Sequence, residues 1–179
     1  LENITAFLVN IHETSTGILY DIDLISEFCK MKKCMLIVDA ISSFLADEIK
    51  MKKYNINVLI VSSQKALALP PGISIIMLDK KAISIVRNNN LKSMYFNLND
   101  YLKNGERGQT PFTPAVSILL QLNKRLKTIE KLGVENIINN TKALAYDFRN
   151  KIKVLPFKVL NKDSSNAVTT LEAMNDVNA

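Results

Sequence analysis

The sequence predicts an α/β fold, built on a mostly parallel sheet that is flanked by helices. Short apolar runs of strand length recur through residues 5–78, and helical or turn-forming segments separate them. Polar residues follow directly after three of these runs, as they do at the ligand-binding edge of an open parallel sheet. We therefore expect one sheet whose polar strand ends share an edge.

Four apolar runs are expected to form this sheet, in the order 5–11, 34–38, 57–61 and 73–78. They are nearly continuous in apolar residues, which is typical of strands buried on both faces. Pro70, Pro71 and Gly72 form a turn into the fourth strand. A further run at 156–160 predicts a strand that begins a new substructure.

Helical periodicity predicts five helices, over residues 23–32, around 44–50, 80–86, 110–132 and 134–151. Asp21 or Asp23 caps the first of them, and Gly133 ends the fourth. Thr113 and Pro114 suit the N-cap and the first helical position of that fourth helix. Residues 88–109 are polar, and we expect them to be irregular.

The composition indicates an ordinary globular chain. Its 179 residues suit one domain, or one domain and part of another, and 47% of them are hydrophobic and 22% charged. The net charge of +6 is spread over lysine clusters beside predicted helices and Trp is absent, so no nucleic-acid surface is expected. Neither a membrane span nor a secretory signal is visible.

The two cysteines are Cys29 and Cys34. They lack the further ligands of a zinc site, and no metal site is expected. A disulfide between them is one alternative, but we expect reduced thiols in a cytoplasmic protein. The chain opens with Leu1 rather than Met, and residues 175–179 form no clear final element, so we expect a piece of a longer polypeptide.

One amine and one carboxylate stand at the ends of neighbouring predicted strands. Asp39 ends the second strand, and Lys65 follows the third, 26 residues further along the chain. That separation suits one crossover between adjacent strands. His12, the single histidine, follows the first strand, so one pocket can hold all three. Taken alone, a strand-end lysine is usually a surface cation and a strand-end aspartate a helix cap.

Three ordered motifs extend this pattern: HETSTG at 12–17, VDAISSF at 38–44 and SSQKALALPPG at 62–72. In residue types, order and spacing they resemble the class V aminotransferases, pyridoxal-phosphate-dependent enzymes of fold type I. The resemblance covers roughly residues 5–150. The second motif is most similar to 2-aminoethylphosphonate–pyruvate aminotransferases, and the third to the alanine–glyoxylate branch.

The resemblance implies a role for each motif residue around pyridoxal 5'-phosphate. Lys65 is implied to be the catalytic residue, which binds the cofactor covalently and then moves the substrate proton. Asp39 pairs with the ring nitrogen, and Ile41 packs on one face of the ring. The full implied cofactor-binding set is Asp39, Ile41, Ser15, Thr14, Gln64, Thr113 and Thr110.

Each of the remaining implied roles has a plainer alternative. Thr14 and Ser15 are implied to contact the ring hydroxyl or the carboxylate side, but they also suit a simple turn. Gln64 is implied to donate to the phosphate, or else it supports Lys65. Thr110 and Thr113 match a loop that crosses a dimer interface to the partner's phosphate, which makes a homodimer the expected assembly.

The resemblance also implies an organisation and a function. Residues 1–140 are the C-terminal part of the large cofactor-binding domain, and residues 141–179 are a connecting helix and the truncated start of a small domain. The function implied is transamination of a small amino donor, either 2-aminoethylphosphonate or alanine/serine, with pyruvate or glyoxylate as the 2-oxo acid. The family's phosphate loop and its substrate-carboxylate arginine fall outside these residues.

Two alternatives stay open beside this function. A non-catalytic fragment or interaction module would keep the fold and bind no cofactor, which cofactor titration would reveal. A cysteine desulfurase shares the fold but places a histidine directly before the lysine, and Gln64 occupies that position.

Overall fold

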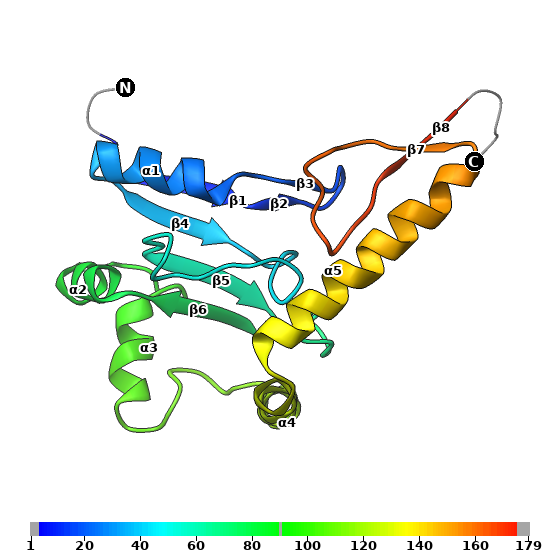
Figure 1. The fold of residues 1–179 in the computed structure, drawn as a ribbon. Helices are drawn as coiled ribbons and strands as arrows, with labels where there is room; N and C mark the ends of the chain where they lie inside the picture. Colours follow the sequence, from blue (N-terminus) through cyan, green and yellow to red (C-terminus); the bar gives the residue numbers. More distant parts are fainter. Residues whose placement is uncertain (1–3, 90, 175–179) are drawn as a thin grey trace.

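A four-stranded sheet lies at the centre of the protein (Figure 1). The computed structural model describes residues 4–89 and 91–174 of the chain. The strands, in spatial order, are β1 (Ala6–Asn10), β4 (Met35–Asp39), β5 (Val58–Ser62) and β6 (Ser74–Leu78). The first three are parallel, and β6 runs antiparallel to β5. This confirms the α/β class and the mostly parallel sheet.

The register of the parallel strands brings their carboxyl ends to one edge. Asn10 of β1 pairs with Asp39 of β4, and Asp39 pairs with Ile60 of β5. The four expected strands match the observed ones to within one residue at every end, because each apolar run is short and bounded by polar residues. The loops after β1, β4 and β5 therefore start side by side.

The core lies on the sheet and under its carboxyl edge. Its central residues are almost inaccessible to water, with relative exposures of 1% or less for Ile11, Leu36, Val38, Ile56, Val61 and Leu67. Burying a side chain of this size contributes about 1.5–3 kcal/mol. Leu67 belongs to the loop after β5, so the same core that holds the sheet together also anchors that loop.

The first two helices each begin at an aspartate N-cap. In α1 (Ile22–Lys32) the Asp21 side chain accepts from two backbone amides, and in α2 (Lys80–Asn88) the Asp79 side chain accepts from Ala82. Phe28 of α1 packs edge-to-face on Phe7 of β1, with ring centroids 5.7 Å apart. The cap of the first expected helix is thus Asp21.

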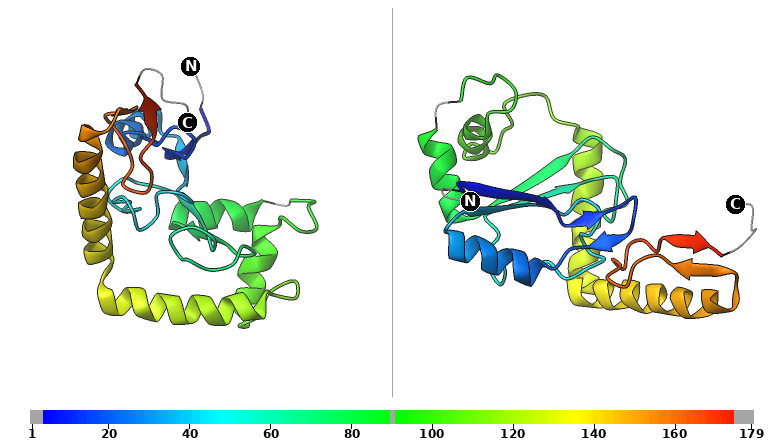
Figure 2. Two further views of the ribbon diagram at one scale, coloured as in Figure 1. Left: turned by 90° about the vertical axis from the view of Figure 1, so that its right-hand side faces the viewer. Right: turned by 90° about the horizontal axis from the view of Figure 1, so that it is seen from above.

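The second half of the chain is mainly helical and adds no strand to the central sheet. It contains α3 (Leu98–Gly105), α4 (Val116–Leu132) and α5 (Val134–Lys151), followed by the short 3-10 helix η1 (Ile152–Val154). α4 and α5 meet at Gly133, which has a φ of 80°, and run in clearly different directions (Figure 2). As a result, α5 carries the chain to the β7–β8 hairpin, which lies away from the sheet.

The C-terminal segment folds back onto the loop after β1. The hairpin strands are β7 (Phe157–Val159) and β8 (Leu171–Ala173), which confirms the strand expected at 156–160. Between them, the chain runs beside the small hairpin of β2 (His12–Glu13) and β3 (Ile18–Leu19). Leu19 N donates to Asp163 O at 2.9 Å, and Ser165 N donates to Gly17 O at 3.0 Å.

Three secondary-structure predictions were wrong. Residues 44–50 form a turn and then an irregular segment rather than a helix, because Leu45 adopts a left-handed φ of 61° that an α-helix cannot continue. The fourth helix begins at Val116, after Ala115 and not Thr113, because Pro111 and Pro114 keep the preceding residues extended. Residues 88–109 are not wholly irregular, since they contain α3.

The structure bears on three further sequence observations. Cys29 and Cys34 are both buried as free thiols. No helix in the described ranges 4–89 and 91–174 is long and apolar enough to span a bilayer. Residues 175–179, expected to form no final element, lie outside the described residues.

Candidate functional site

The loops after β1 and β4 are joined through His12 and Ser42. His12 is fully buried; its Nδ1 lies 3.1 Å from the carbonyl oxygen of Ser42, and the Ser42 hydroxyl donates to the carbonyl of His12 at 3.2 Å. His12 Nε2 is buried without a hydrogen-bond partner in the described part of the chain. His12 therefore fixes the relative position of two strand ends and keeps one ring nitrogen unused.

Asp39 lies at the end of β4, and only one oxygen of its carboxylate accepts a hydrogen bond from the described residues. Its Oδ1 accepts from the backbone N–H of Ile41 at 2.9 Å, which fixes the orientation of the carboxylate group. Its Oδ2 accepts no hydrogen bond from any residue that the structure describes. The side chain is half-buried, so it can accept a hydrogen bond from a ligand placed over the strand ends.

The loop after β5 is closed by Ser63. The Ser63 hydroxyl donates to Pro70 O at 2.7 Å and accepts from Ile73 N at 3.3 Å, and Ser63 N donates to Ile73 O at 3.0 Å. Leu69 N adds a further bond to Ser63 O at 3.0 Å. Ser63 is fully buried, and this set of bonds holds residues 63–73 as a closed loop.

Lys65 stands on this closed loop with an unpaired amine. Its side chain is exposed and makes no hydrogen bond or ion pair with the residues described in the structure. It lines a cavity of about 390 Å³ together with Thr14 from the β2–β3 turn and Ser42 from the loop after β4. The structure thus places Lys65 and Thr14 in one cavity. Asp39 and His12, which we expected to share a pocket with Lys65, do not line it: His12 is buried against Ser42 O, and Asp39 Oδ1 is bonded to Ile41 N.

Three other expected site residues, Ile41, Gln64 and Ser15, do not line this cavity. Ile41 is half-buried, and Gln64 is exposed. The Ser15 hydroxyl and N–H donate to Glu13 Oε1 at 2.7 and 3.0 Å, which lowers the pKa of the Glu13 carboxyl. The plainer explanation for Ser15, that it satisfies a turn, is therefore observed.

Thr110 and Thr113 lie before α4, away from the cavity. The Thr110 hydroxyl donates to Phe112 O at 2.6 Å, and the Thr113 side chain is exposed. Neither residue lines the Lys65 cavity. Their expected contact with a partner subunit's cofactor stays a prediction.

Arg125 lines the cavity from α4 and was not among the expected site residues. Leu122 and Ile129, three residues before and four after it, are buried on the same side of the helix. A charged residue at an apolar-face position was the available signal. The C-terminal residues Ala167 and Val168 also line the cavity, and no local sequence pattern indicated this.

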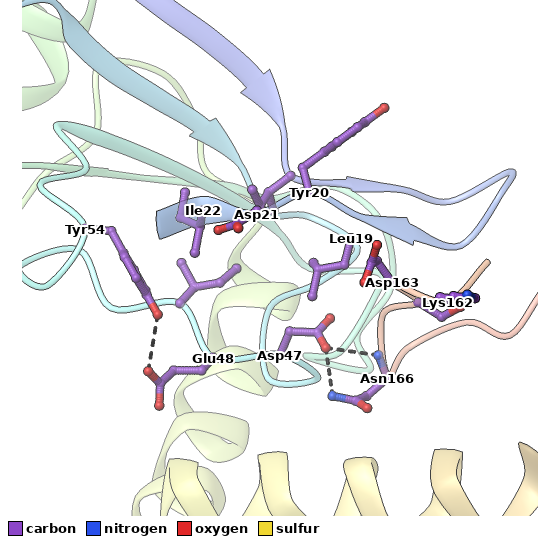
Figure 3. Close-up of a pocket in the computed structure, with 13 residues that line it drawn as sticks. Leu19, Tyr20, Asp21, Ile22, Asp47, Glu48, Tyr54, Lys162, Asp163 and Asn166 are labelled. Atoms are coloured by element: carbon purple, nitrogen blue, oxygen red, sulfur yellow. Dashed lines mark hydrogen bonds between the residues drawn. The ribbon is translucent and has the colours of Figure 1, made fainter. Parts of the chain in front are cut away.

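A larger cavity of about 530 Å³ lies between α1, the turns at 47–54 and the C-terminal segment (Figure 3). Its carboxylates include Asp47 and Glu48, which are engaged by Asn166 and Tyr54 respectively. Lys65 does not line this cavity, and Asp39 lines neither of the two. The larger cavity therefore lacks the lysine that the candidate site requires.

A family model described as aminotransferase class-V matches residues 2–177, so it includes every element described above. The chain belongs to the class-V aminotransferases. Among its relatives, an uncharacterised aminotransferase of Methanocaldococcus jannaschii is 33% identical over 174 residues, which cover 96% of this chain and 45% of that protein. The serine–glyoxylate aminotransferase of Arabidopsis thaliana is 34% identical over 138 residues, 75% of this chain and 34% of that protein.

Solved structures show the same fold. The subgroup IV aspartate aminotransferase of Thermus thermophilus superimposes with a TM-score of 0.86 at 24% identity, over 99% of this chain and 50% of that one. This class-V aminotransferase chain therefore has the fold of a type I large domain. It spans less than half the length of the two curated relatives described above.

Proposed function

We propose that this chain supplies the lysine and the ring-nitrogen carboxylate of a pyridoxal-phosphate-dependent aminotransferase. The observation that carries the proposal is the pair Lys65 and Asp39. Asp39 ends β4, and Lys65 follows the adjacent parallel strand β5. Among the described residues, the Lys65 amine on its closed loop has no partner, and one Asp39 carboxylate oxygen accepts no hydrogen bond. The residues present fit the cofactor, since they offer the amine and the acceptor that it requires.

When bound, pyridoxal phosphate would serve as the electron sink for the reaction. The Lys65 amine would hold the group covalently and, once released by the donor's amine, would move the proton at the substrate Cα. Asp39 Oδ2 would accept from the protonated ring nitrogen and keep the proton there. The Ile41 N–H bond to Oδ1 would hold the carboxylate in that orientation.

The other family residues are proposed to support this arrangement. Ile41 would pack on the ring face. Thr14 has a hydroxyl on the cavity wall, and Ser15 would accept from the ring hydroxyl, since its own proton is given to Glu13. Gln64, exposed beside Lys65, would donate to the phosphate.

We further propose a substrate class and an assembly. The amino donor would be 2-aminoethylphosphonate or alanine/serine, and the acceptor pyruvate or glyoxylate. The chain would act in a cytoplasmic homodimer in which residues 110–113 reach the partner's cofactor. Residues 1–140 would belong to the large domain and 141–179 to a connecting helix and the start of a small domain; α5 running away from the sheet supports this division (Figure 2).

Lys65→Ala tests the proposal in the full-length protein. We expect the variant to lose both the visible absorption band of the lysine-bound cofactor and the cofactor-modified Lys65 peptide seen by mass spectrometry after borohydride reduction. Lys52→Ala, which removes another exposed lysine, should leave both signals in place. An unchanged band in Lys65→Ala would end the assignment. Product formation from each donor with each acceptor then identifies the substrates.

A further inference from the structure

Arg125 is a half-buried cation with unused donors beside Lys65. Its Nη2 donates to Ala66 O at 3.2 Å, the carbonyl next to Lys65, and its Nε is buried without a partner in the described part of the chain. No other hydrogen bond and no ion pair involves its side chain among those residues. A guanidinium has five N–H donors, so most of them remain available.

The cavity around Arg125 has a strongly one-sided charge. It contains two cations, Lys65 and Arg125, and the hydroxyls of Thr14, Ser42 and Thr141. No Asp or Glu lines it. A partly buried cation without a counter-charge is costly, and an acidic group in the cavity would offset that cost.

The structure holds the guanidinium in place. Leu122 and Ile129 are buried on either side of Arg125 along α4, so the helix cannot shift easily relative to the core. The bond to Ala66 O ties the side chain to the closed loop that carries Lys65. A fixed planar fork of donors is suited to bind a carboxylate or a phosphonate with two hydrogen bonds.

We infer that Arg125 forms a subsite for a distal acidic group of the donor, one carried by a carbon other than the amino-bearing carbon at which Lys65 acts. The inference rests on the proposed function, and it narrows the donors to molecules with such a group, such as 2-aminoethylphosphonate, and away from alanine and serine. Arg125 is a specificity residue in this account, because it binds a part of the substrate that does not react.

Anion binding to the full-length protein tests the subsite without turnover. Isothermal titration with succinate and with methylphosphonate measures affinity for a carboxylate and a phosphonate separately. Arg125→Gln should weaken binding of the preferred probe by about ten- to a hundredfold, as expected for losing hydrogen bonds to a charged group. Lys124→Gln removes a neighbouring exposed charge from the same helix and should change affinity less than twofold.

Arg125→Lys keeps the charge but removes the fork, so its affinity should fall several-fold, between those of the wild type and Arg125→Gln. This variant decides the matter if Arg125→Gln does not fold. Equal affinity in the wild type and Arg125→Lys, or equal effects of Arg125→Gln and Lys124→Gln, would overturn the inference.

Steady-state kinetics adds a second readout. In Arg125→Gln, kcat/KM should fall at least tenfold more for 2-aminoethylphosphonate or aspartate than for alanine. A uniform fall for all donors would show a positioning role instead and would refute the subsite. The two proposals fail separately: Arg125-dependent anion binding without any cofactor band would remove the aminotransferase function but keep the subsite.

Discussion

At the scale of single residues, the turn that carries Thr14 and Ser15 is organised by one carboxylate. Glu13 accepts from both the hydroxyl and the N–H of Ser15, and these bonds favour the charged form, so the pKa of Glu13 lies below its ordinary value of 4.5. A lowered folded-state pKa stabilises the protein above the unfolded value, and this stabilisation is lost as pH falls through the folded value. The shape of the turn therefore depends on an ionised Glu13.

Ser15→Ala tests this dependence. Removing the hydroxyl deletes the first of the two bonds, so the pKa of Glu13 should rise toward 4.5 while the N–H bond remains. Carboxyl-detected NMR titration of the protein without cofactor measures the change. Thr14→Ala is the matched control, because the Thr14 hydroxyl makes no bond to Glu13 in the described structure. A Glu13 pKa that stays low in Ser15→Ala would show that the hydroxyl is not responsible.

At the scale of elements, Asp47 fastens the C-terminal segment to the turns after β4. Asp47 is buried; it accepts from the Ser165 hydroxyl, from Asn166 N at 3.0 Å and from Asn166 Nδ2 at 2.8 Å. From the other side, Arg149 of α5 donates to Ser165 O and, through Nε, to Thr169 at 3.0 Å. These bonds place the next residues against the Lys65 cavity.

Asp47→Ala should release that segment. The substitution leaves buried donors without an acceptor, so the free energy of unfolding should fall by about 3 kcal/mol. Amide hydrogen exchange should also rise across residues 161–170 more than in β4 and β5. Asp163→Ala, which removes an exposed carboxylate from the same segment, is the control. Uniform exchange changes across the chain would contradict a local fastening role.

The sequence could predict the elements whose signals are local. Apolar runs predicted the strands, and the pair Asp21 and Asp23 predicted the start of α1, where the structure has Asp21 as the cap. The lack of a helix at 44–50 could not be foreseen, because the left-handed Leu45 is held there by tertiary packing in the core. Arg125 was missed for the same reason: its place beside Lys65 depends on how α4 crosses the loop after β5, which no periodicity reveals.

At the scale of the whole molecule, residues 110–113 do not line the Lys65 cavity of their own chain. Thr113 is exposed and does not cap α4, and the Thr110 hydroxyl is used locally. The proposed homodimer gives this segment a function, because it would lie against the partner's cofactor phosphate. In the proposed homodimer, each cofactor site would contain residues from both chains.

Mixed dimers test this sharing. Thr113→Ala alone should weaken cofactor binding about tenfold, the size expected for one hydrogen bond to a charged group. A mixed dimer of Lys65→Ala and Thr113→Ala chains should contain one intact site, which binds cofactor with wild-type affinity at half the stoichiometry. Tagged co-expression followed by cofactor titration measures both values. Weakened binding at that remaining site would show that Thr113 serves its own chain's cofactor.

The hydrogen bonds of Ser63 also affect how much conformational entropy is lost when a ligand attaches to Lys65. Because the backbone on either side of Lys65 is already closed by Ser63, Pro70 and Ile73, only the flexible stem of the lysine must lose freedom when a ligand attaches. That entropy loss is about 2 kcal/mol, whereas ordering a loop of several residues would cost roughly 1–2 kcal/mol for each of them. The Lys65 amine is therefore carried by a flexible side chain on a backbone that is already ordered.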